Sequence, residues 1–307
     1  MQLAIVFWFY RDVAVCTNRV RLLRRRNPDV PVFGLYGGPL GEFEVFRSAV
    51  GSMVDDLWAF PEDREPAWKW RNGDLVLTRW FVDRGASLGW ESIFVAQWDM
   101  VVGAPLSRVL PPMAGGDMLL SGLRPVSEVE TWWRWTRWSE TQEEYQSFVA
   151  HVERHFGQVP EPLCCQFLGA VLPRSFLERY SQVEEPELGF LEYKLPIYAQ
   201  AFGIHLLPDT CFRPFWAEEP RSSAPRRSEQ LLHAWPTPLR LPVIVAHMRR
   251  PGGARIFHPY HGIYPHDLRS LREMWSWRRD GQRRVAPAST PSMSSASRSS
   301  ERRPSTA

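Results

Sequence analysis

The sequence predicts an α/β fold in which a mostly parallel sheet is flanked by helices, and three observations support this. Over the first hundred residues, strand-like apolar runs alternate with helix-like segments, the pattern of a parallel sheet covered by helices on both faces. Residues 3–10 are continuously apolar, as expected of a strand buried on both faces. A second apolar run begins at Ile93 and soon reaches one carboxylate, Asp99.

The elements of the first half, residues 1–105, follow from local patterns. Apolar residues at spacings of three and four predict a helix over 13–26, with Asp12 as its N-cap and Asn27-Pro28 at its end. The other expected elements are strands at 30–36 and 53–60, helices at 43–50 and 73–89, and the strand that begins at Ile93.

The second half, residues 106–280, has a looser pattern, and we expect one domain over 1–280. Its expected elements are strands at 117–123, 167–172 and 204–207, helices at 143–156 and 188–202, and an apolar stretch at 242–247 that we interpret as the last strand. Residues 221–227 resemble a mobile loop, and the Arg/Ser/Pro composition of 281–307 predicts a disordered tail.

Composition excludes several classes of protein. The net charge is +3, but residues 278–307 hold seven arginines and two acids, so the rest is slightly acidic and is not a basic nucleic-acid binder. No apolar run reaches the roughly 20 residues of a transmembrane helix. The four cysteines form no C-x-x-C pair, which favours a reducing, cytoplasmic setting over a zinc knuckle or a disulfide framework.

Several motifs are absent from the sequence. It contains no G-x-G-x-x-G, no Walker A pattern and no G-x-S-x-G elbow, which argues against a Rossmann dehydrogenase, a P-loop enzyme and an α/β-hydrolase.

In an open α/β sheet, ligands bind outside the carboxyl ends of the strands, so Asp99 is the first candidate site residue. The alternative for Asp99 is a solvated turn residue or a helix cap.

The triplet Gln97-Trp98-Asp99, with the order of elements over residues 3–265, resembles the GT-A-fold glycosyltransferases that use nucleotide sugars. Their Asp-x-Asp motif ends a strand about a hundred residues into the chain. The resemblance implies that Asp99 binds a Mn²⁺ or Mg²⁺ ion bridging the diphosphate of a UDP- or GDP-sugar donor. Gln97 stands where the family has its first Asp, which puts metal use in question.

The resemblance also implies a late histidine as a further metal ligand, and His258 in Phe257-His258-Pro259 is our candidate, with His261 and His266 close by. Imidazole suits Mn²⁺ better than Mg²⁺. One alternative is a polar loop whose histidines contact water or backbone. Another is a zinc hydrolase site built from the three histidines, although no H-E-x-x-H accompanies them.

A catalytic base is implied at the start of a helix in the second half, if the enzyme inverts configuration. Glu192 matches that place, with Glu187 as the fallback. A base must reach the proton that it removes, and burial tunes its pKa. The alternatives for Glu192 are an acid that is favourable to the helix dipole or a partner of Lys194.

The nucleotide contacts that the resemblance suggests are Arg11, at the end of the first strand, Asp55 with Asp56 in the third strand, and Arg79 before the metal strand. The planar guanidinium matches phosphate geometry. Each of these residues has the alternative of an ordinary surface charge.

Four tryptophans lie where the acceptor side of such an enzyme would be built: Trp132, Trp133, Trp135 and Trp138. Indole rings stack on sugars and also supply packing area. With Arg134 and Arg137, an exposed cluster would also suit association with a membrane surface.

The leading hypothesis is a cytoplasmic, metal-assisted transferase that moves a sugar from a nucleotide diphosphate to a hydroxyl acceptor, which is a glycan, a lipid-linked molecule or a small molecule. A second hypothesis is a catalytically silent binding or scaffold protein on the same fold. The third is the zinc hydrolase. Gln97 is the residue that separates the first two hypotheses.

Overall fold

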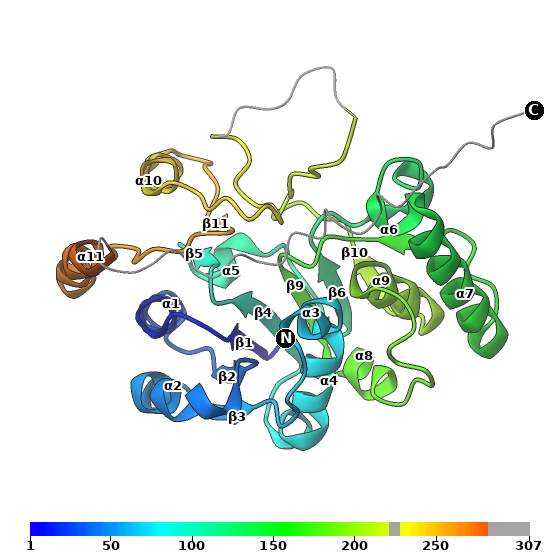
Figure 1. Cartoon of the computed structure of the whole chain (residues 1–307), viewed down its shortest axis with the longest axis horizontal. Helices are drawn as coiled ribbons and strands as arrows, with labels where there is room; N and C mark the ends of the chain where they lie inside the picture. The colour runs from blue at the N-terminus through cyan, green and yellow to red at the C-terminus, as the bar shows by residue number, and fades with distance from the viewer. Residues whose placement is uncertain (221–227, 282–307) are drawn as a thin grey trace, which may run out of the picture.

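The central feature of the computed structural model, which describes residues 1–220 and 228–281, is a seven-stranded sheet (Figure 1). Its order is β10 (His205–Leu207), β6 (Asp117–Leu120), β9 (Ala170–Pro173), β4 (Ser92–Gln97), β1 (Leu3–Phe9), β2 (Val32–Tyr36) and β3 (Asp56–Ala59). Strands β1 to β4 are parallel, and β9 is antiparallel to its neighbours β4 and β6. The predicted fold class, a mostly parallel sheet flanked by helices, is confirmed.

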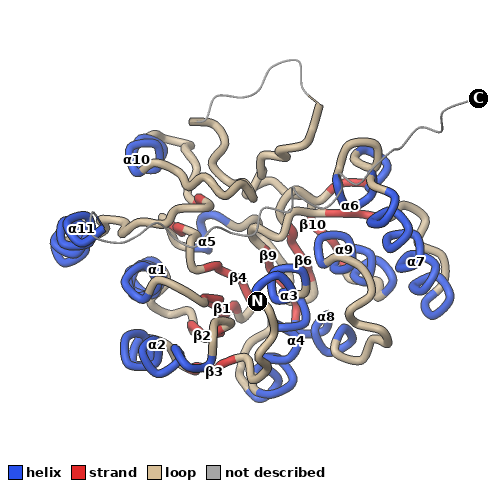
Figure 2. The backbone as a smooth tube through the Cα atoms, in the orientation of Figure 1, coloured by secondary structure: helices blue, strands red, loops and turns tan. Residues whose placement is uncertain are grey.

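Helices cover both faces of the sheet, as Figure 2 shows. Side chains at successive positions of β1 point to opposite sides of the sheet. Because these side chains are apolar on both sides, both faces need a covering layer of helices. Ile5 and Phe7 pack with α1 (Val13–Arg26) and α2 (Phe43–Val50), whereas Ala4 and Val6 share a core with α4 (Gly73–Asp83). Both α1 and α2 have the bounds that the sequence predicts.

The remaining helices are α3 (Pro66–Arg71), α5 (Leu106–Val109), α6 (Arg134–Arg137), α7 (Ser139–Phe156), α8 (Arg174–Tyr180), α9 (Leu191–Ala201), α10 (Leu241–Arg249) and α11 (Leu268–Gly281). Short 3₁₀ turns occupy Leu40–Glu42, Gly51–Met53, Gly85–Ser87 and Val126–Glu128. Two small ladders pair β5 (Val101–Val102) with β11 (Ile256–Phe257) and β7 (Arg124–Pro125) with β8 (Leu163–Cys164).

The prediction of a strand at 242–247 is wrong, because these residues form most of α10. A short apolar run cannot distinguish a strand from a helix by periodicity, and Pro242 is tolerated in the first turn of the helix, where its missing N–H is not needed. The predictions for 221–227 and for the tail lie outside the described residues, except that Gly281 ends α11.

A buried ion pair fastens α9 to the rest of the domain. Lys194 Nζ lies 2.8 Å from Asp74 Oδ2, and both side chains are 0% exposed. Tyr180 donates a hydrogen bond to the same carboxylate oxygen, and Lys194 also donates to the carbonyl of Pro186. The partner of Lys194 is therefore Asp74 on α4, not Glu192.

The strand order places a switch point between β1 and β4. The chain leaves β1 for β2 and β3 on one side and then returns to β4 on the other side. The crevice between two such oppositely directed connections is where open α/β sheets bind ligands. Tyr10, Arg11 and Asp12 follow the carboxyl end of β1, and Trp98 and Asp99 follow that of β4.

Candidate functional site

Asp99 is the centre of the candidate site, and two histidines converge on its carboxylate. His258 Nε2 lies 3.2 Å from Asp99 Oδ1, and His261 Nε2 lies 3.4 Å from Oδ2. The Asp99 side chain is only 11% exposed. The structure thus brings together the two predicted metal ligands, which are 159 positions apart in the sequence, and adds His261.

The electrostatics of this group favour a charged carboxylate. Burial raises the pKa of Asp99, but the charges and hydrogen bonds of His258 and His261 outweigh burial and hold this pKa well below its usual range. For His258, burial lowers the pKa, and the Asp99 carboxylate more than compensates, so the pKa is raised. Each group stabilises the charged form of the other.

The orientation of the His258 ring fits a metal ligand. Its Nδ1 lies 2.9 Å from the carbonyl oxygen of His233. A proton on Nδ1 that is donated to this carbonyl leaves Nε2 to carry a second proton toward Asp99 or, with a cation bound, to donate its lone pair to the metal. Apart from this pair with His258, Asp99 Oδ1 has no hydrogen-bond partner among the described residues, although it is buried. An imidazole held through its other nitrogen by a carbonyl is a common arrangement around metal ions, so the residues present suit a divalent cation.

The segment that carries these histidines, residues 256–264, is here called the histidine strap, and it is anchored at three places. Its first residues form β11 against β5. The Tyr260 N–H donates to the carbonyl of Asp99 at 2.8 Å. The buried guanidinium of Arg19 on α1 donates to the carbonyls of Tyr260 and Gly262, at 2.8 and 2.9 Å. These contacts fix the strap above β4.

Arg19 is the positioning residue that sequence reasoning missed. It lies in the basic stretch of α1, where several arginines follow one another, and no local pattern distinguishes the buried one. Its backbone partners are carbonyl groups more than 240 positions away, and it also donates to the neighbouring Asn18 Oδ1 at 2.6 Å. His261 is close to His258 in the motif His258-Pro259-Tyr260-His261, but the sequence favours His258 as the ligand.

A cationic side chain, Arg11, lies over the indole of the residue that precedes Asp99. The exposed Arg11 guanidinium lies 4.6 Å from the centre of the Trp98 ring, and His261 stacks on the same indole at 5.1 Å. Arg11 thus follows β1 at the switch point, as predicted, and is held over the residue that precedes Asp99.

Glu192 is linked to the end of β4 through the backbone of one residue, Phe167. The Gln97 side-chain amide donates to the carbonyl of Phe167 at 2.7 Å, and the N–H of Phe167 donates to Glu192 Oε1 at 3.1 Å. Glu192 is half-buried near the start of α9, and burial raises its pKa to about 8. Gln97 is therefore used as a hydrogen-bond donor.

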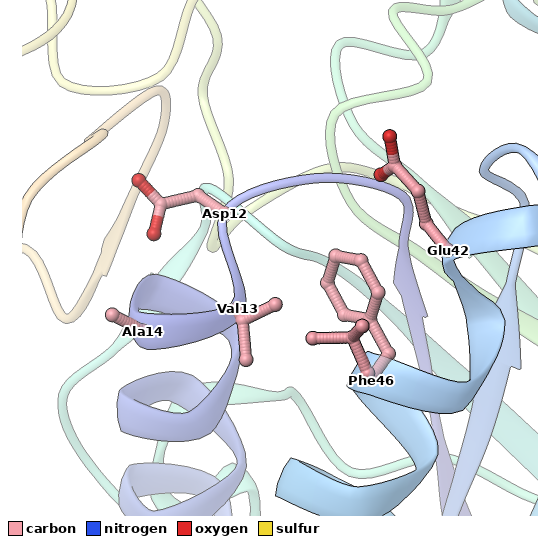
Figure 3. A pocket seen from close by; sticks show the side chains of 6 residues that line it. Asp12, Val13, Ala14, Glu42 and Phe46 are labelled. Carbon is pink, nitrogen blue, oxygen red and sulfur yellow. The ribbon is translucent and has the colours of Figure 1, made fainter. Parts of the chain in front are cut away.

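A hollow of about 490 Å³ opens beside the carboxyl end of β1. Figure 3 shows it between the start of α1 and the start of α2, with Asp12 on one side and Glu42 and Phe46 on the other. One oxygen of Asp12 accepts the N–H of Val15 at 3.1 Å, which confirms Asp12 as the N-cap of α1. The hollow thus combines apolar walls with two carboxylates.

Three predicted nucleotide contacts lie elsewhere. Asp55 and Asp56 were expected to end or interrupt the third strand, but they lie at its beginning, at the amino edge of the sheet. Asp55 pairs with Arg24 at 2.6 Å and accepts the N–H of Val32, and Asp56 pairs with Arg84. Strand β3 starts three residues later than predicted, which reverses the edge to which these acids belong.

Arg79 also lies away from the diphosphate side. It is exposed in the second half of α4, a helix that leads back toward the amino edge of the sheet, and it pairs with Asp83 at 3.0 Å. The fallback base, Glu187, is an exposed carboxylate that contacts Trp68.

The zinc hydrolase hypothesis is not supported. His266 lies near the start of α11, where its nearest charged partner is Asp267 at 3.4 Å. Over residues 1–220 and 228–281, no three His, Cys, Asp or Glu side chains are grouped so that they alone could hold a metal ion. A cation at Asp99 would therefore take further ligands from water or from a substrate.

Some side chains of the tryptophan group are packed against other aromatic rings, and one is exposed. Trp133 is buried against Trp216, Trp135 stacks on Phe190, and Trp138 is 59% exposed. The four rings form no common face, so the cluster mainly packs the second half of the domain.

The fold and the site define an α/β domain with a polar centre at the switch point of its sheet. No protein-family model matches the chain, and no curated protein matches it in sequence. Among solved structures it is similar to a cytidylyltransferase from Leptospira borgpetersenii serovar Hardjo-bovis, with a TM-score of 0.36 and 10% identity over 69% of this chain and 78% of that one.

Two further solved structures are similar. One is the galactosyltransferase LgtC in complex with donor and acceptor sugar analogs, with a TM-score of 0.38 and 11% identity over 66% of this chain and 72% of that one. The other is glucosyl-3-phosphoglycerate synthase from Mycobacterium tuberculosis in complex with Mn²⁺, UDP and phosphoglyceric acid, with a TM-score of 0.33 and 13% identity over 57% and 56%. All three likenesses are distant, and the evidence for function is the geometry of the site.

Proposed function

We propose that this protein transfers a sugar from a nucleotide diphosphate donor to a hydroxyl acceptor with the help of a divalent cation. The observation that carries the proposal is the convergence of His258 and His261 on the buried carboxylate of Asp99 at the switch point of the sheet. A carboxylate and an imidazole are suitable ligands for Mn²⁺.

Asp99 and His258 would hold the cation. When bound, a Mn²⁺ or Mg²⁺ ion offsets the negative charge that develops on the leaving diphosphate. Arg11 would contact the same phosphates, because its exposed guanidinium is held over Trp98, next to Asp99.

The nucleoside end of the donor would occupy the hollow between α1 and α2. The two carboxylates that line the hollow, Asp12 and Glu42, are hydrogen-bond acceptors. The ribose hydroxyls and the N–H groups of uracil or guanine would be the donors. The apolar wall, which includes Phe46, would cover a ring face.

Glu192 would act as the base that takes the proton from the acceptor hydroxyl. Burial brings its pKa to about 8, and an effective base has a pKa near the working pH. The bond from Phe167 to Glu192 Oε1 holds the carboxyl group in place and leaves the other oxygen for the proton.

The first test is a thermal-shift experiment with UDP, GDP, CDP and dTDP, each with and without Mn²⁺. A ligand at about 100 times its Kd stabilises the native state by about 2.7 kcal/mol. We expect one nucleotide to raise the Tm of the wild type only with Mn²⁺, and Asp99→Ala to lose this response. Asp117→Ala is the matched control, because Asp117 forms a similar pair with His205 at 2.8 Å at the amino end of β6.

The outcomes separate the hypotheses. If no nucleotide shifts the wild type under any metal condition, the transferase proposal fails. If a nucleotide binds but no sugar is transferred or hydrolysed from the matching nucleotide sugar, a binding or scaffold protein on the same fold becomes the better reading. Equal losses in Asp99→Ala and Asp117→Ala would remove Asp99 from the site.

A further inference from the structure

Helix α11 carries two apolar stripes, of which only one is used for packing. Met274 is buried, and Trp277 is packed against the core cluster that contains α1. Leu268, Leu271 and Trp275 are instead exposed, at 77%, 39% and 59%. These three positions are spaced by three and four residues, so their side chains lie on one face of the helix.

The orientation of α11 is fixed, so the second stripe cannot turn inward. The carboxylate of Glu273 accepts two hydrogen bonds from Arg21 on α1, both of 2.9 Å. At the start of the helix, the N–H of Ser270 donates to Asp267 Oδ1 at 2.7 Å. Figure 1 shows α11 at the outer left edge of the molecule, beyond α1.

Two arginines lie close in sequence to the exposed stripe, and one of them, Arg269, pairs with Glu273 at 3.1 Å. Arg269 and Arg272 are exposed on α11 itself. From Leu268 to the end of the chain the sequence contains nine arginines and three acids, whereas the preceding residues contain more acids than bases. The basic character of the protein is therefore concentrated on α11 and the sequence that follows it.

We propose that α11 docks the protein on an anionic lipid surface, with Leu268, Leu271 and Trp275 entering the interface and the arginines contacting lipid phosphates. A helix with Trp and Leu on one face and Arg beside it is the kind of element that lies in a membrane interface, and each basic residue near an anionic leaflet adds to the attraction. No helix in the described part of the chain is long and apolar enough to cross a membrane. The docking does not depend on the proposed reaction.

The test is co-sedimentation of the full chain with phosphatidylcholine vesicles that contain or lack phosphatidylglycerol. We expect binding to the anionic vesicles, weakened by added salt, and little binding to the neutral ones. Trp275→Ala should lower the partition coefficient about tenfold, the effect of losing one large buried side chain. Leu271→Ser should act in the same direction.

Trp138→Ala is the matched control, because Trp138 is also 59% exposed and directly precedes α7, which lies on the opposite side of the molecule from α11 in Figure 1. It should leave vesicle binding unchanged. All variants alter exposed side chains, and unchanged Tm values will show that they fold.

Three results would overturn the proposal. The first is the absence of binding to anionic vesicles. The second is a loss of binding in Trp138→Ala that equals the loss in Trp275→Ala. The third is binding that Arg272→Gln weakens and Trp275→Ala does not, since the helix would then attract polyanions such as nucleic acid without inserting into lipid.

Discussion

The protonation of Glu192 is linked to folding, and replacing it with glutamine tests this link. Burial raises the pKa of Glu192 from 4.5 to about 8, so in this range the folded chain keeps a proton that the unfolded chain releases. The resulting stabilisation is fully present below pH 4.5 and is lost as the pH rises through 8. One pKa unit corresponds to about 1.4 kcal/mol, which sets an upper limit of about 5 kcal/mol.

Water reaches the half-buried side chain and reduces this figure, so we expect a change of about 2–4 kcal/mol. The Glu192→Gln variant keeps an oxygen that accepts the N–H of Phe167, but it does not titrate. The difference in the free energy of unfolding, wild type minus variant, should therefore fall by this amount between pH 4.5 and 8.

The measurement is urea denaturation of both proteins across this pH range. Glu187→Gln is the control, because Glu187 is a carboxylate of the same segment whose side chain is 55% exposed. A flat or rising difference for Glu192→Gln would refute the reasoning. If Glu192 is the base, kcat/KM of the wild type should also rise with pH up to about 8.

Three further predictions concern the anchors and the cation. Arg19→Met should destabilise the fold by about 2–4 kcal/mol in urea denaturation, because two buried carbonyls lose their donor, and it should weaken the Mn²⁺-dependent nucleotide shift; an unchanged shift would mean that the strap holds without it. Lys194→Met should cost about 3–5 kcal/mol by leaving Asp74 buried without its cation, and the double variant with Asp74→Leu should recover part of that loss; a double variant as unstable as the single one would contradict this. EDTA should abolish the nucleotide shift of the wild type, and a shift that survives EDTA would exclude a cation as the bridge.

The sequence predicts β1, β2 and β4 of the first half well because these strands are buried on both faces. A continuous apolar run such as residues 3–10 has few alternatives to a central strand, and the helices at 13–26 and 43–50 have the predicted bounds. The run at 242–247 is too short for its apolar character to distinguish a strand from a helix. This character predicts a strand, whereas the structure has α10 there.

The edge of the sheet at which a candidate residue lies is predictable only where the residue follows a strand whose end is clear. Asp99 and Arg11 follow the ends of β4 and β1, so their edge of the sheet was fixed once the strands were known. The predicted position of Asp55 is wrong because β3 starts three residues later than expected, which moves Asp55 to the opposite edge of the sheet. No local sequence pattern predicts the role of Arg19, because the carbonyls that it binds belong to a segment more than 240 positions away.

Gln97 donates a hydrogen bond through its amide at the position where the resemblance to the GT-A fold implies a first carboxylate. Its Nε2 donates to the carbonyl of Phe167, whose N–H in turn holds Glu192. A carboxylate at position 97 has no proton to donate, and it would face the carbonyl oxygen with like charge, so the link to Glu192 would be lost. The amide therefore connects the strand of Asp99 to the candidate base at the expense of one charged ligand. With fewer carboxylates around the cation, the imidazole of His258 gains importance, and we expect Mn²⁺ to support nucleotide binding better than Mg²⁺.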